Sequence, residues 1–142
     1  VYRGPRPDSR ILAQLVVSKV HGILDLESGL YEIWTRREGD EEFLAKAVGI
    51  DHEHLRLSDF TPPSKHDLEY AISFIKEQVP LGGVYIHCLH GVDRTGVVCA
   101  AYRVWEQGWP VNRAIGEMLE YGFHRRWYWW WISRVRRTLD KR

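Results

Sequence analysis

The chain has 142 residues, of which 44% are hydrophobic, and its 20 basic and 19 acidic side chains give a net charge of +1. A chain of this length buries roughly two thirds of its unfolded surface, so we expect one folded domain over residues 1–142. Two cysteines are too few for a disulfide-rich scaffold, and no apolar stretch approaches the ~20 residues of a membrane-spanning helix.

Short apolar runs alternate with amphipathic stretches along the chain. Strands are predicted over residues 22–26, 53–57 and 83–86, and helices over residues 40–48, 64–79 and 111–119. Ser64 and Asp67 have the spacing of a capping box at the start of the second helix, and Gly122 follows the third. Strands that alternate with helices predict an α/β fold, with a central, mostly parallel sheet flanked by helices.

The most informative segment is His-Cys-Leu-His-Gly-Val-Asp-Arg-Thr-Gly at residues 87–96, between a predicted strand and an apolar, helix-like run. A loop that leads into a helix turns several backbone N–H groups toward one point, where the helix dipole also favours an anion. The planar guanidinium of Arg94 can hold two oxygens of one phosphoryl group. The segment therefore predicts a phosphate-binding loop formed by Leu89, His90, Gly91, Val92, Asp93 and Arg94.

Cys88 is the candidate nucleophile at the base of this loop. A free cysteine has a pKa near 8.5, and a helix N-terminus with a neighbouring cation commonly lowers it to between ~3.5 and ~7.5. Thr95 is placed to donate a hydrogen bond to the sulfur, and Gly91 permits the positive φ or close approach that such a loop demands. The alternative is a structural cysteine in a strand-to-helix turn with a surface arginine nearby.

The segment resembles the signature of the cysteine-dependent phosphatases, His-Cys-(five residues)-Arg-Ser/Thr-Gly, and the compact chain is most similar to their dual-specificity branch. Residues 1–7 resemble the first-strand entry of bacterial members, and residues 21–26 resemble the next core strand. The resemblance implies a protein tyrosine or dual-specificity phosphatase that hydrolyses phosphomonoesters through a phosphocysteine, without a metal or other cofactor. Cys88, Asp59, Arg94 and Thr95 would be its catalytic residues.

Asp59 is the candidate general acid, because a departing alkoxide or phenoxide needs a proton. It lies in Leu-Ser-Asp-Phe-Thr-Pro-Pro-Ser, residues 57–64, which resembles the acid loop of the same family. The alternative is that Asp59 only begins a turn before the prolines. Asp51, which precedes a predicted strand, and Asp67, in the capping box, are weaker candidates.

The resemblance leaves several substrates open. The first expectation is a phosphotyrosine-like aryl phosphate or a phosphoprotein, and the second is a polyphosphorylated small molecule such as an inositol phosphate, as in the phytase-like members. His90 and Gly91 also resemble the RNA 5′-triphosphatases, which have Asn where this chain has Asp93. A non-catalytic phosphate-binding module is a further alternative, and no nucleic-acid partner is expected.

The run Arg-Arg-Trp-Tyr-Trp-Trp-Trp-Ile, residues 125–132, places bulky rings around a whole helical turn. We expect a terminal helix that packs on the domain, with arginine stems over ring faces. The alternatives are an exposed patch for a partner or membrane surface, or a second contact of Arg125 and Arg126 with an anionic substrate.

Two expectations concern the thiols and the compartment. Cys99 follows the loop in an apolar run and is expected to pack in the core, with a role as redox partner of Cys88 as the alternative. Cys88 must be reduced to act, which favours the cytoplasm. A periplasmic or secreted location fits if an upstream signal was removed.

Overall fold

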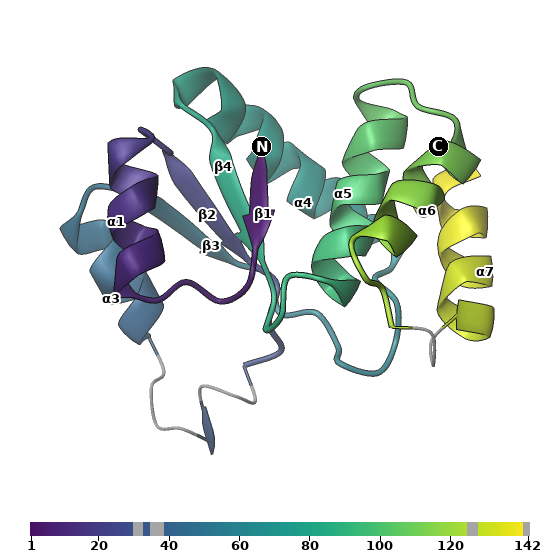
Figure 1. Cartoon of the computed structure of the whole chain (residues 1–142), viewed down its shortest axis with the longest axis horizontal. Coiled ribbons are helices and arrows are strands. Elements are labelled where there is room, and N and C mark those ends of the chain that lie inside the picture. The colour runs from purple at the N-terminus through teal and green to yellow at the C-terminus, as the bar shows by residue number, and fades with distance from the viewer. Residues whose placement is uncertain (30–32, 35–38, 125–127, 141–142) are drawn as a thin grey trace.

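A computed structural model describes residues 1–29, 33–34, 39–124 and 128–140 of the chain (Figure 1). Its elements, in chain order, are β1 (Tyr2–Gly4), α1 (Ser9–Val17), β2 (Gly22–Asp25), α3 (Asp40–Ala47), β3 (Asp51–His54), α4 (Lys65–Gln78), the 3₁₀ turn η1 (Val79–Leu81), β4 (Val84–His87), α5 (Asp93–Trp105), α6 (Val111–Glu120) and α7 (Tyr128–Asp140). Within the described residues, no helix is long and apolar enough to cross a bilayer.

The four strands form one parallel sheet in the order β1-β4-β2-β3. Figure 1 shows α1 and α3 beside one face of the sheet and α4, α5, α6 and α7 on the other side. The core divides accordingly. A small cluster that includes Leu12, Ile23 and Ala45 lies under α1 and α3, and a larger cluster fills the space between the sheet and the remaining helices. The predicted α/β fold with a parallel sheet flanked by helices is confirmed.

The predicted helices over residues 40–48 and 64–79 are confirmed as α3 and α4. The capping box is present: Ser64 Oγ accepts from the Asp67 N–H and Asp67 Oδ2 accepts from the Ser64 N–H, both at 3.1 Å. The predicted helix over residues 111–119 is confirmed as α6. These elements were visible in the sequence because capping and helical periodicity depend on neighbours within one or two turns.

The strand predicted over residues 53–57 is wrong in its position. The strand β3 is the polar segment Asp-His-Glu-His, residues 51–54, and residues 55–57 lie beyond it. Among the described strands, β3 pairs only with β2, so it is an edge strand and shows no apolar alternation. Leu57 is nevertheless buried, as a loop residue packed on the larger core, which is why its hydrophobicity resembled a strand signal.

The register of the sheet decides where chemistry can occur. Gly4 of β1 and Asp25 of β2 both pair with His87, the last residue of β4. The carboxyl ends of three strands therefore meet at one edge, from which the loop to α5 departs. Ligands of open parallel sheets bind outside this edge, so the loop after β4 has the position of a binding site.

Candidate active site

The loop between β4 and α5 contains the residues of the predicted phosphate-binding loop. Cys88 follows the last residue of β4, and α5 begins at Asp93. Among the described residues, the backbone N–H groups of residues 89–94 donate to no protein oxygen. Unpaired N–H groups at a helix N-terminus are donors for an anion. The loop therefore has the donors that a phosphoryl group requires.

The surroundings of Cys88 lower the pKa of its thiol. Burial by itself would raise that pKa, but hydrogen bonds from the Thr95 hydroxyl, from the backbone N–H groups of Thr95 and Gly91, and the charge of Arg94 together outweigh it. The Thr95 hydroxyl is fully buried and has no nitrogen or oxygen partner among the described residues, so it is available to the sulfur. These groups favour the thiolate, the nucleophilic form of cysteine.

Arg94 and Asp59 meet above the loop. Arg94 is buried, and its Nη1 lies 2.7 Å from Asp59 Oδ1 and 3.5 Å from the carbonyl oxygen of Leu26. The Asp59 side chain is 30% exposed, and its second oxygen accepts a hydrogen bond of 2.8 Å from Ser28 Oγ. The structure thus brings the predicted acid to the predicted phosphate-binding arginine, although they are far apart in the sequence.

The weaker acid candidates lie elsewhere. Asp51 begins β3 and accepts a hydrogen bond of 3.0 Å from Gln78 Nε2, and Asp67 belongs to the capping box of α4. Neither contacts the loop through any hydrogen bond or ion pair of the described residues. Asp59 is therefore the carboxylate, among the three, that the fold delivers to Arg94.

Gly91 has the positive φ, +74°, that the sequence predicted for the loop. A β-carbon on Gly91 would also collide with the backbone carbonyl of Gly4 at the end of β1. The carbonyl of Gly91 accepts a hydrogen bond of 3.3 Å from Arg3 Nη2. The loop therefore packs directly on β1, and only glycine fits at this position without a shift of the backbone.

His90 and Asp93, the loop residues considered above in connection with the substrate class, have different environments. His90 is exposed, whereas Asp93 lies at the first turn of α5 and contacts His124 twice: it accepts from the His124 backbone N–H at 3.0 Å and pairs with Nδ1 at 2.7 Å. Asp93 is therefore a paired charge. Arg125 and Arg126, the candidate secondary anion contacts, lie outside the described residues.

A buried charge network beneath Cys88 was not predicted from the sequence. His87 is fully buried; its Nδ1 donates to the Cys88 carbonyl at 3.1 Å and its Nε2 donates to Glu41 Oε2 at 2.8 Å. His52 Nε2 lies 2.6 Å from the same Glu41 oxygen. The sequence feature that belongs to this network is the acidic start of α3, Asp-Glu-Glu, but no local sequence pattern connects these residues with His87.

The network keeps His87 in its charged form. Burial would lower the pKa of His87, but the hydrogen bond and charge of Glu41 raise it to about 9. Burial would also raise the pKa of Glu41, and the hydrogen bonds from His52 and His87 lower it to about 2. Burial raises the pKa of the neighbouring Asp25 to about 6. Because both ring nitrogens of His87 donate protons, neither offers a lone pair to a metal ion in this arrangement.

The Trp-rich segment is divided between core and surface. Trp131 on α7 is buried, with its ring centroid 5.9 Å from that of Phe123, and Ile132 is buried beside it. Trp130 is about half exposed. The expected packing of a terminal helix is thus observed for the described part of the run, while a partner or membrane contact through its rings remains a prediction.

Known proteins agree with this geometry. A model of the family described as "Polymorphic toxin system, DSP-PTPase phosphatase" matches residues 1–108. The chain belongs to this DSP-PTPase family. The predicted resemblance to the cysteine-dependent, dual-specificity phosphatases is confirmed.

Individual relatives of this DSP-PTPase include a fungal and a bacterial phosphatase. A tyrosine-protein phosphatase CDC14 homolog of Schizosaccharomyces pombe is 28% identical over 114 residues, which are 80% of this chain and 20% of the relative. The dual specificity protein phosphatase TpbA of Pseudomonas aeruginosa is 48% identical over 42 residues, 30% of this chain and 19% of TpbA. The alignments thus cover about a fifth of the length of these curated relatives.

Solved structures share the fold. The active form of Tk-PTP superposes with a TM-score of 0.77 at 25% identity, covering 97% of this chain and 89% of Tk-PTP. PTPMT1 gives a TM-score of 0.75 at 18% identity, with 98% of this chain and 88% of PTPMT1 covered. The parallel sheet and the loop after β4 therefore lie on a phosphatase fold.

Proposed function

We propose that the chain is a metal-independent phosphomonoester hydrolase that uses Cys88 as nucleophile and passes through a phosphocysteine. The observation that carries the proposal is the contact of Asp59 with Arg94, at 2.7 Å, beside a thiol of lowered pKa. Nucleophile, phosphate-binding cation and proton donor are then assembled in one place.

In the first step, the Cys88 thiolate attacks phosphorus in line with the leaving oxygen. The S–P bond forms as the P–O bond to the leaving group breaks, and Asp59 gives its proton to that oxygen. Arg94 and the backbone N–H groups of residues 89–94 hold the other three phosphoryl oxygens. The charge that a metal supplies in other phosphatases comes here from the guanidinium and the helix end.

In the second step, water attacks the phosphorus of the phosphocysteine. Asp59, now a carboxylate, takes a proton from that water, and the S–P bond breaks to release inorganic phosphate. The departing sulfur becomes a thiolate again, stabilised by the Thr95 hydroxyl and by Arg94. Ser28 donates to Asp59 Oδ2 and so holds the carboxyl group above the loop for both proton transfers.

The substrate class that we propose is a phosphotyrosine-like aryl phosphate or a phosphoprotein. TpbA, which is 48% identical to this chain over 42 residues, has been crystallised with pTyr as a variant in which a cysteine is replaced by serine. In the loop itself, Asp93 is paired with His124, so this pair adds no net positive charge for a polyanion. Among the described residues that form the site, Arg94 is the one fixed cation, which suits a substrate with a single phosphoryl group.

A polyphosphorylated small molecule is the second candidate. PTPMT1 has been crystallised with PI(5)P, and SIW14, a PP-IP phosphatase, shares the fold with a TM-score of 0.71 at 20% identity. The basic C-terminal residues of the chain favour a polyanion, as does the exposed His90. An RNA 5′-triphosphatase or a non-catalytic module is less well supported, because neither uses an acid placed on Arg94.

A substrate panel tests the proposal. Phosphate release is measured with a phosphotyrosine peptide, a phosphothreonine peptide, inositol hexakisphosphate and PI(5)P, each with the wild type, Cys88→Ser and Cys99→Ala. We expect turnover of the phosphotyrosine peptide that Cys88→Ser abolishes and Cys99→Ala retains. Preference for inositol hexakisphosphate would select the second candidate. Turnover that survives in Cys88→Ser would disprove the mechanism.

A further inference from the structure

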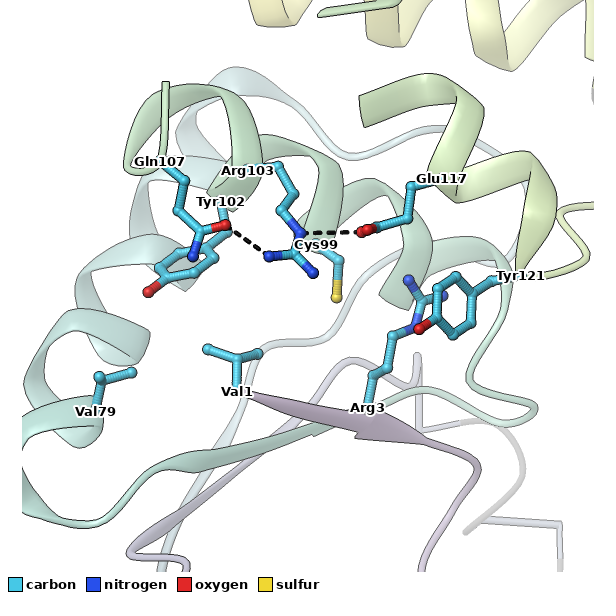
Figure 2. A pocket seen from close by; sticks show the side chains of 9 residues that line it. All are labelled: Val1, Arg3, Val79, Cys99, Tyr102, Arg103, Gln107, Glu117 and Tyr121. Atoms are coloured by element: carbon cyan, nitrogen blue, oxygen red, sulfur yellow. Dashed lines mark hydrogen bonds and ion pairs between the residues drawn. The ribbon is translucent and has the colours of Figure 1, made fainter. Parts of the chain in front are cut away.

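A cavity of about 190 Å³ is lined by Arg3 of β1 and by side chains of the neighbouring helices (Figure 2). It lies between the edge strand β1 and helices α5 and α6, and its volume equals that of about six water molecules. Figure 2 shows Arg3 entering from β1, Cys99, Tyr102 and Arg103 from α5, and Glu117 from α6. None of these residues has a role in the proposed hydrolysis.

Arg3 is the unusual member of this cavity. Its guanidinium stacks on the Tyr121 ring, 4.0 Å from the centroid, and its Nη2 donates to the Gly91 carbonyl. The Nε and Nη1 atoms are buried and have no hydrogen-bond partner among the described residues, and no carboxylate of the described residues pairs with Arg3. Buried N–H donors are normally satisfied, so these two donors lack an acceptor.

The other charges of the cavity neutralise each other. Arg103 Nε lies 3.1 Å from Glu117 Oε1, and Arg103 Nη1 donates to Gln107 Oε1 at 2.7 Å. Glu117 is the one carboxylate among the lining residues, and Arg103 already balances it. The positive charge of Arg3 therefore remains uncompensated in a partly enclosed space, where an anion is attracted more strongly than at an open surface.

We propose that this cavity is a second anion site, which binds a small oxyanion, a phosphate, sulfate or carboxylate group, through the uncompensated positive charge of Arg3. Tyr102, Tyr121 and Gln107 contribute polar side chains to the lining of the same space. The anion is separated from the Cys88 loop by one side chain, because Arg3 also holds the Gly91 carbonyl.

Binding can be measured without catalysis, so the test is independent of the proposed hydrolysis. Iodoacetate first converts Cys88 to its carboxymethyl form, which fills the catalytic cradle. Cys99 is spared, because burial raises its pKa to about 11. Sodium sulfate, and in a parallel titration sodium malonate, is then added at constant ionic strength to the isotope-labelled chain. Backbone amide shifts of Cys99, Tyr102 and Arg103 are followed by NMR.

Three variants make the titration decisive. Arg3→Gln removes the unpaired charge and should weaken binding by at least 10-fold. Gln107→Glu places a carboxylate on the exposed rim of the cavity, where it cannot disturb the core, and should weaken binding about threefold. Arg10→Gln removes an exposed arginine of α1, outside the cavity, and should leave the affinity unchanged.

Saturable shifts at the cavity with either anion, weakened by Arg3→Gln and Gln107→Glu and kept in Arg10→Gln, would establish the site. The proposal is overturned if neither anion gives saturable shifts there, or if folded Gln107→Glu binds as the wild type does. Should Arg3→Gln fail to fold, Gln107→Glu and Arg10→Gln still decide the question.

Discussion

Asp59 and Arg94 contact each other directly, with 2.7 Å between Oδ1 and Nη1. Before a substrate enters, the proposed proton donor is therefore bound to the guanidinium that is proposed to hold the phosphate. A phosphoryl group needs the N–H groups of the same guanidinium, so it must take Nη1 from the carboxylate as it binds. Asp59 is then released beside the leaving oxygen, where a general acid is required.

Replacing Asp59 should reveal its role through the leaving group. Asp59→Asn keeps the shape of the side chain and removes the acid, so we expect a loss of about 100-fold or more in kcat/KM for an alkyl phosphate. Nitrophenyl phosphate, whose leaving group needs little protonation, should lose less than about 10-fold. Steady-state kinetics on both substrates provide the comparison. Equal losses would show that Asp59 does not act as the acid.

Ser28 should act through Asp59. Its Oγ donates to Asp59 Oδ2 at 2.8 Å, which fixes the orientation of the carboxyl group. Ser28→Ala should lower kcat for the alkyl phosphate by about threefold to 10-fold, in line with the loss of one hydrogen bond worth about 1 kcal/mol, and leave KM nearly unchanged. In the Asp59→Asn background the same change should have no further effect. Additive losses in the double variant would contradict this positioning role.

The sequence predicted the parts of the site that are close along the chain. Cys88, Arg94 and Thr95 belong to one loop, and a strand, a glycine-containing turn and a helix start leave that loop few conformations. The same locality explains the capping box of Ser64 and Asp67. Asp59 was predicted through its resemblance to an acid loop, and the structure adds its contact with Arg94.

Contacts between residues far apart along the chain could not be predicted from the sequence. Glu41 and His87 are 46 residues apart, and Arg3 and Gly91 are 88 apart, so neither pair leaves a local pattern. The edge strand β3 was misplaced because its polar residues serve this buried network and not an apolar face: His52 pairs with Glu41. Helix α1 was not predicted; its Asp8 cap accepts from the Ile11 N–H at 2.8 Å, but only Leu12 and Leu15 are buried.

Gly91→Ala should disable the loop. The φ of +74° costs an alanine roughly 1–2 kcal/mol, and the β-carbon also collides with the Gly4 carbonyl. Gly108→Ala is the matched control, because Gly108 has a φ of +71° and open space around its β-carbon position. Both variants should lose stability in urea denaturation, whereas only Gly91→Ala should lose more than about 10-fold in kcat/KM. Full activity of Gly91→Ala would show that the loop tolerates a shift away from β1.

Oxyanion inhibitors and chelators should separate this mechanism from a metal-dependent one. Vanadate can accept the Cys88 thiolate and the N–H groups of the loop, so it should inhibit competitively with a phosphotyrosine peptide. Incubation with EDTA followed by desalting should leave kcat within about twofold of the untreated enzyme. Loss of activity on chelation, restored by a divalent cation, would refute the metal-free scheme.

Glu41→Gln should weaken the fold in a pH-dependent way. Glu41 has a pKa lowered to about 2, so its stabilising contribution is complete above about pH 4.5 and is lost as the pH falls toward 2. His87 has a pKa raised to about 9, so its contribution is complete below about pH 6.5 and is lost as the pH rises through 9. The pair therefore stabilises the fold most between about pH 4.5 and 6.5. Asp25, with a pKa raised to about 6, acts in the opposite direction to Glu41: its contribution to stability is lost as the pH rises through 6.

Removing one partner of a buried ion pair costs about 3 kcal/mol or more, which for a chain of this size lowers the Tm by on the order of 10 °C. We expect this difference between wild type and Glu41→Gln near pH 6, and a much smaller one above pH 9, where His87 is neutral in the wild type as well. Glu42→Gln, which removes the next carboxylate of α3 and its exposed pair with Lys46, is the control and should leave the Tm nearly unchanged. Calorimetry from pH 5 to pH 10 measures all three proteins. A Tm difference for Glu41→Gln that stays constant over this range would mean that packing, and not the charge of His87, accounts for the loss.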